Sequence, residues 1–137
     1  MINTLFDLLC FNITRTDSKL ITFITNNSNR TNLLSACFNE ILELYDYKFI
    51  IMNNIYNHIN NTLFNDIKYI VADCINTDSK DINKLLNDLK KYNKKIILLT
   101  KIDIFNDMSD LVIREDNKYN LKVIKNNYGE LFDLIDF

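Results

Sequence analysis

Polar side chains that can hold a phosphate follow the first strongly apolar run of the sequence. Residues 24–31 read ITNNSNRT, and Asn29, Arg30 and Thr31 offer an amide, a guanidinium and a hydroxyl group. A basic side chain followed by a hydroxyl can hold a phosphate and its magnesium ion, provided that backbone N–H groups converge on the phosphate oxygens. Glycine makes that convergence possible, and this segment contains none. We therefore expect no working phosphate site here.

Residues suited to acid–base or nucleophilic catalysis are few and scattered. The one histidine, His58, lies in a polar setting with Asn57, Asn60 and Asn61, and no acid or nucleophile pairs with it. Asp73 ends an apolar run, and we interpret it as a cap on a strand end. The three cysteines show no CxxC spacing and, with one histidine, leave few ligands for zinc. The sequence thus predicts no catalytic residue, metal or cofactor, and no enzyme.

Length, composition and charge limit the kind of protein this is. The 137 residues are 47% hydrophobic, which is enough for the core of one domain. A net charge of -2 gives no broad basic surface, so we expect no direct binding to nucleic acid. No apolar run reaches the roughly 18 to 20 residues of a membrane span. We expect a cytoplasmic or nuclear protein with no direct membrane contact.

Strand and helix patterns alternate over residues 19–137, which we interpret as one domain. Apolar residues recur at helical spacing at Ile82, Leu85, Leu86 and Leu89. Five short, nearly continuous apolar runs predict strands covered on both faces, at 20–24, 48–52, 68–72, 95–99 and 121–124. The alternation predicts an α/β fold, a three-layer αβα sandwich around a mainly parallel five-stranded sheet.

Three segments outside these runs have weaker patterns. Residues 104–119 are polar and acidic with an apolar patch at 111–113, and we interpret them as a short helix followed by a loop. Residues 131–135 fit a closing helix. Residues 1–18 form an amino-terminal extension that suits an amphipathic helix or an added edge strand.

The run at 19–34 resembles the first strand, phosphate loop and first helix of a Ras-like small GTPase. In that register, Ile24 and Asn29 stand where the family has its two glycines, Arg30 replaces the lysine, and Thr31 keeps the hydroxyl residue. The resemblance implies a vestigial phosphate loop at Asn29, Arg30 and Thr31, because the residues that shape and charge the loop are replaced.

A second segment, 69–103, resembles the fourth strand, third helix and fifth strand of the same family. Thr100, Lys101 and Asp103 match a Thr-Lys-x-Asp variant of its guanine-reading motif, in which the aspartate accepts hydrogen bonds from the base and the lysine packs along the nucleotide. The resemblance implies a vestigial guanine-reading site. An ordinary strand end with solvated charges explains the same residues.

Neither switch region of a small GTPase has a counterpart in the chain. The strand at 48–52 ends in Asn53 and Asn54 without the acid and glycine of the family, and no room remains for the first switch loop. The resemblance therefore implies a P-loop NTPase, Ras-like topology lacking the switch regions. It is that of a pseudo-GTPase, comparable to centromere protein M or the GTPase-like domains of adaptor-binding assembly proteins.

A response-regulator receiver is the alternative resemblance. It would place Asp73 at the phosphoacceptor, Thr100 at the switch hydroxyl and Lys125 at the phosphate-contacting lysine. The acidic pair that would hold magnesium is replaced by Asn26 and Asn27, which compete poorly for that ion. A degenerate receiver would act by binding as well. Both resemblances imply the strand order 2-1-3-4-5.

These observations predict a catalytically inactive, GTPase-like adaptor or assembly subunit that binds protein partners in a larger complex. GTP binding is not expected. Part of the partner surface is expected from the apolar side chains of Leu5, Phe6, Leu9 and Phe11. The alternatives are a pseudo-receiver signalling module and a divergent GTP-binding protein.

Overall fold

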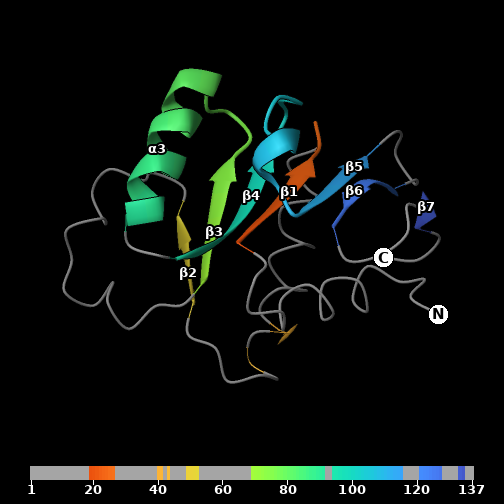
Figure 1. The fold of residues 1–137 in the computed structure, drawn as a ribbon, viewed down its shortest axis with the longest axis horizontal. Coiled ribbons are helices and arrows are strands. Elements are labelled where there is room, and N and C mark those ends of the chain that lie inside the picture. The colour runs from red at the N-terminus through yellow and green to blue at the C-terminus, as the bar shows by residue number, and fades with distance from the viewer. Residues whose placement is uncertain are drawn as a thin grey trace.

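A computed structural model gives a mixed, mainly parallel sheet with a helix packed on one face (Figure 1). It describes residues 19–26, 40, 41, 43, 49–52, 69–91, 94–115, 121–127 and 133–134. The described elements are, in chain order, β1 (Leu20–Ile24), β2 (Phe49–Met52), β3 (Tyr69–Cys74), α3 (Ser79–Lys91), β4 (Lys95–Thr100), the 3-10 turn η3 (Asn106–Met108), β5 (Leu111–Glu115), β6 (Leu121–Asn126) and β7 (Asp133–Leu134).

The sheet has the order β2-β3-β4-β1-β5-β6-β7. The pairs from β2 to β5 are parallel, whereas β5–β6 and β6–β7 are antiparallel. The prediction of an α/β domain with a mainly parallel sheet is therefore confirmed. The nearly continuous apolar runs follow from this arrangement, since β1 and β4 are buried along their whole length.

The observed strand order differs from the order 2-1-3-4-5 that both resemblances imply. In the order 2-1-3-4-5, β1 would lie between the second and third strands, but it pairs with β4 on one side and β5 on the other. After β4, the chain passes over β1 and returns as β5, so residues 101–110 form a crossover connection. One of the two parallel neighbours of β1, the strand β5, thus comes from the segment whose structure the sequence predicted least well.

Two further predictions at the carboxy-terminal end are corrected. Residues 111–115, predicted as part of a loop, form β5, whose first three residues are fully buried. Residues 133–134 form β7 rather than part of a closing helix, and Leu134 is paired with Leu121. The predicted strand at 121–124 exists as β6, but it is antiparallel to β5. A hairpin needs only a short connection, so two apolar runs close in sequence pair directly.

Helix α3 follows the predicted apolar stripe. Ile82, Leu85, Leu86 and Leu89 are all buried, which confirms their assignment to the core face. Burying side chains of this size stabilises a fold by roughly 1.5 to 3 kcal/mol each. The helix begins after Asp78, whose carboxylate accepts a hydrogen bond from the Asp81 backbone N–H at 2.9 Å.

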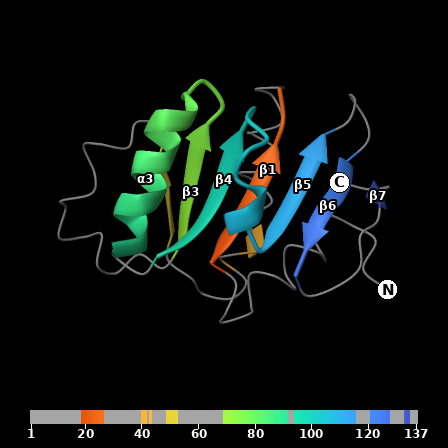
Figure 2. The same ribbon diagram turned by 45° about the horizontal axis from the view of Figure 1, so that its top comes forward.

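The crossover lies on the same face of the sheet as α3 (Figure 2). Phe105 is buried and belongs to the same apolar cluster, together with Leu20, Ile70, Ala72, Cys74, Ile82, Leu85, Leu86, Leu89, Ile96 and Leu98. The ammonium of Lys125 on β6 donates to the carbonyls of Asn106 and Asp107 in η3, at 2.7 and 3.2 Å. A short turn thus covers β1 where a helix usually lies in a βαβ unit.

Asp110 fixes the amino edge of the sheet. Its carboxylate accepts the backbone N–H groups of Lys19 and Leu20 at 2.7 and 3.1 Å, and the side-chain amide of Asn127 at 3.1 Å. These bonds hold the starts of β1 and β5 and the end of β6 together. In the part of the chain that the structure describes, no helix is long and apolar enough to cross a membrane.

Candidate functional site

The carboxyl ends of β1 and β4 mark the place where a ligand site is expected in this sheet. After β1 the chain continues to β2 at one side of the sheet, and after β4 it continues to β5 at the other. Open α/β sheets bind ligands at the carboxyl ends of strands whose connections diverge in this way. The Ras-like resemblance placed its functional residues after these strands, and the receiver resemblance placed part of its set there.

Thr25 lies at the centre of this edge and is held from two sides. Its backbone N–H donates to the carbonyl oxygen of Thr100 at 2.9 Å, so the chain continues alongside β4 past the last residue of β1. Its hydroxyl donates to a carboxylate oxygen of Glu115, at the end of β5, at 2.8 Å. Thr25 is buried, at 2% exposure. The segment predicted as a vestigial phosphate loop therefore starts against a carboxylate.

The Asp73 carboxylate bonds to the backbone of the turn that follows β3. Its carboxylate accepts a hydrogen bond from the N–H of Ile75 at 3.4 Å, and the Thr77 N–H donates to the carbonyl of Cys74 at 3.1 Å, so a turn follows β3. Burial raises the pKa of the Cys74 thiol from 9.0 to about 11, while a hydrogen bond with Thr77 lowers this pKa and the Asp73 charge raises it. The interpretation of Asp73 as a strand-end cap agrees with these contacts.

The predicted guanine-reading residues are engaged within the protein. Thr100 is buried, and its hydroxyl accepts a hydrogen bond from the Ile102 N–H at 3.1 Å. The ammonium of Lys101 donates to the side-chain oxygen of Asn76 at 3.3 Å. Lys101 therefore leans toward the turn after β3.

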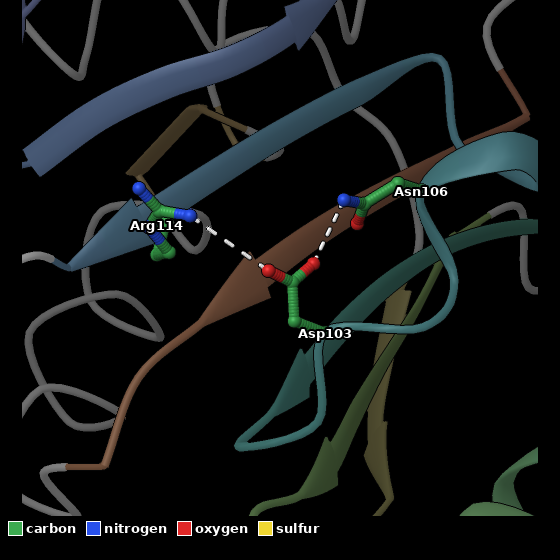
Figure 3. A network of polar contacts seen from close by, with 3 residues as sticks. All are labelled: Asp103, Asn106 and Arg114. Carbon is green, nitrogen blue, oxygen red and sulfur yellow. Dashed lines mark hydrogen bonds and ion pairs between the residues drawn. The ribbon is translucent and has the colours of Figure 1, made fainter.

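Both carboxylate oxygens of Asp103 have partners (Figure 3). One accepts the side-chain amide of Asn106 at 2.7 Å, and the other lies 3.7 Å from the guanidinium of Arg114 on β5. A base-reading aspartate must offer both oxygens to the base. Here one oxygen is bonded within the crossover, and the other forms a partly exposed ion pair with β5.

The residues of the receiver alternative are not brought together. Asp73 and Thr100 lie at the carboxyl ends of β3 and β4, whereas Lys125 pairs with Val112 near the start of β5 and holds the carbonyls of η3. A phosphate on Asp73 would be out of its reach. This separation follows from the antiparallel direction of β6, which a sequence pattern does not reveal.

Several predicted residues lie outside the part that the structure describes. They are Asn29, Arg30 and Thr31 of the loop, His58, and the amino-terminal Leu5, Phe6, Leu9 and Phe11. Sequence reasoning missed Arg114 and Glu115, whose roles depend on β5. A signal for them existed in the apolar patch at 111–113, which is followed directly by these two charged residues.

Comparisons with known proteins assign no family. No family model matches the sequence, and no curated protein is significantly similar to it. Among the described residues, no three side chains of His, Cys, Asp or Glu are grouped so that they could hold a metal ion.

Proposed function

We propose that this chain is a catalytically inactive α/β domain of nucleotide-binding type that acts as a protein-binding subunit of a larger complex. The observation that supports the inactive part of the proposal is the contact between Thr25 and Glu115, which places a carboxylate against the start of the glycine-free loop. The binding part follows from the pseudo-GTPase resemblance of the sequence. The domain keeps the sheet edge at which such folds bind ligands, but the groups at that edge bind one another.

Electrostatics oppose a phosphate at this position. A phosphate charge about 4 Å from a carboxylate near a protein surface would be disfavoured by about 4 kcal/mol. A ligand with a dissociation constant of about 1 mM gains only about 4 kcal/mol in total. The carboxylate would therefore cancel a weak phosphate interaction. The missing glycines remove the converging N–H groups that could offset the repulsion.

The Ras-like resemblance accounts for the segment after β1, but the observed strand order is not the one that it implies. In that family the strand before the loop lies between the second and third strands of this series, whereas β1 lies between β4 and β5. The receiver order, 2-1-3-4-5, differs in the same way. Because the observed strand order matches neither resemblance, both ATP and GTP must be tested.

The inactive part of the proposal is tested by calorimetric titration with GTP or ATP in the presence of magnesium. We expect no saturable heat up to about 1 mM nucleotide. The divergent GTP-binding alternative predicts the opposite, together with weaker binding by Asp103→Ala and unchanged binding by Asp107→Ala, an exposed aspartate of η3. Saturable binding of either nucleotide would overturn the proposal.

The proposed membership of a larger complex is tested by the size at which the protein elutes. A tagged chain, expressed in the cells that make it and purified gently, should elute as part of a larger complex whose other members dissociate in denaturant. Elution at the size of the isolated chain would contradict a role as an assembly subunit.

A further inference from the structure

Residues 101–109 of the crossover pass over β1 with little support from backbone hydrogen bonds, and we call this segment the strap. Its two ends are fixed by β4 and by Asp110, whose N–H donates to the carbonyl of Leu20 at 2.8 Å. Between these ends, among the described residues, no backbone N–H of the strap donates to a backbone carbonyl of a strand. The Ser109 N–H donates to the carbonyl of Asn106 at 3.2 Å, within the strap. Side chains must therefore hold the strap on the sheet.

Side chains from three strands tie the strap down. Each tie joins one strand to one part of the strap: Lys125 of β6 to η3, Arg114 of β5 to Asp103, and Thr22 of β1 to Ser109. The Arg114 ion pair is partly exposed and contributes little in water. In the strap itself, only Phe105 and Ser109 are buried. Segments with few buried contacts and few backbone bonds to the rest of the fold open at low free energy.

A β-bulge in β6 directs Lys125 toward the strap. Val112 pairs with Lys125 and Ile113 pairs with Val123, so Ile124 is an extra residue without its own partner on β5. In a regular pairing Ile124 would lie opposite Val112, and Lys125 would face the other side of the sheet. The bulge therefore lets the ammonium reach two carbonyls of η3, at 2.7 and 3.2 Å.

The closed strap is not fully satisfied in its contacts. The side-chain oxygen of Asn106 is buried and has no hydrogen-bond partner. A buried acceptor without a partner costs free energy, which is recovered when water reaches it. Ile104 and Met108 remain 58% and 38% exposed, so the apolar burial of the strap comes from Phe105 and the partly buried Ile102.

We propose that the strap opens away from the sheet as one unit, between its fixed ends, while the domain stays folded, and that Lys125 is the latch that keeps it closed. Opening exposes the apolar cluster on which Phe105 packs, which includes Leu20 and Leu98. The strap is thus a removable cover for this face of the sheet. The proposal concerns a movement of the fold and does not depend on the proposed function.

The test is native-state hydrogen exchange of the full chain, followed for single amides by NMR as urea is added below the unfolding transition. The Ser109 N–H reports on the strap, and the amides of β4, a buried strand paired on both sides, report on the sheet. After correction for intrinsic rates, Ser109 should exchange at least about tenfold faster than β4 and with little dependence on urea, because strap opening exposes little surface.

The substitution Lys125→Met removes the latch. Exchange of Ser109 should become faster by about tenfold, and exchange of Ile102 by the same factor, because two bonds of an ammonium to carbonyls are lost. The Ile102 N–H is bonded to the Thr100 hydroxyl at the other end of the strap, so a shared factor reports movement of the whole strap. Lys80→Met, at an exposed position on α3, is the matched control and should change both rates by less than about twofold.

Three results would refute the latch. They are Ser109 exchange as slow and as dependent on urea as that of β4, a Lys125→Met variant in which Ser109 and Ile102 do not speed up together, and equal acceleration by Lys80→Met. The first comparison uses the unaltered chain, so it decides the question even if the Lys125 variant does not fold. Calorimetric titration with nucleotide tests the proposed function separately, because it measures binding at the carboxyl edge.

Discussion

At the scale of single residues, Ser109 joins the crossover to the strand beneath it. Its hydroxyl donates its only proton to the carbonyl of Phe105 at 2.7 Å. Its oxygen also lies 2.7 Å from the hydroxyl of Thr22 on β1, and both side chains are buried. Because the Ser109 proton is already used, Thr22 must be the donor of that second bond.

Because Thr22 is the donor in this bond, we expect substitutions of Ser109 and Thr22 to lower the free energy of unfolding by different amounts. Ser109→Ala leaves a buried hydroxyl and a carbonyl without their partner, and should lower the free energy of unfolding by about 2 to 3 kcal/mol. Thr22→Val removes a donor whose partner keeps another bond, and should cost about 1 kcal/mol. Urea denaturation of both single variants and the double variant measures this. Equal costs would contradict the assigned direction.

The Cys74 thiol makes stability depend on alkaline pH. Burial raises its pKa from 9.0 to about 11 in the folded protein, so the unfolded chain loses this proton first as the pH rises. The stabilisation from the protonated thiol is complete below pH 9. As the pH rises from 9 to 11, the free energy of unfolding should fall by about 3 kcal/mol.

The measurement is urea denaturation across this pH range, with Cys74→Ala as the control. Tyrosine and lysine residues titrate in both proteins, so the stability difference between wild type and variant isolates the thiol. That difference should shrink as the pH rises from 9 to 11. A constant difference would show that Cys74 does not titrate as its burial requires.

At the scale of elements, α3 is positioned by its cap and by its apolar stripe. Asp78 satisfies one of the backbone N–H groups that have no partner within the helix, and its charge is favourable at the positive end of the helix dipole. Lys90 and Lys91 are favourable at the other end for the same reason. The stripe then fixes which face of the helix packs on the sheet.

Asp78→Ala should therefore lower the free energy of unfolding by about 1 kcal/mol. Thermal or urea denaturation measures the change. Asn83→Ala is the matched control, because Asn83 is exposed within the helix and alanine has the higher helix propensity, so this variant should be neutral or slightly more stable. A loss as large as that of Asp78→Ala would show that the cap is not the cause.

At the scale of the whole molecule, the two edges of the sheet differ in character. The carboxyl edge carries Asp73, Asp103 and Glu115, each bonded within the protein, and the amino edge carries exposed lysines. The proposed loss of nucleotide binding belongs to the first edge. That proposal depends on strand order, because the same residues on a differently ordered sheet would have other neighbours.

Much of the fold could be predicted from the chain itself, because hydrophobic periodicity is a local property. The run at 20–24 is β1 without change, and the stripe from Ile82 to Leu89 is the buried face of α3. The candidate site could be predicted only in part. Thr25 and Asp103 belonged to segments singled out as vestigial, but their partners Glu115 and Arg114 did not.

The sequence by itself determined the strands β1, β2, β3, β4 and β6, which face of α3 is apolar, and that the loop after β1 lacks the glycines of a phosphate site. Only the tertiary structure decided that β5 lies beside β1, that Glu115 contacts Thr25, and that Lys125 is far from Asp73. The physical reason is the separation along the chain of the residues that interact. Strand and helix patterns arise from neighbouring residues, whereas strand order depends on long-range pairings that bring together residues far apart in the chain.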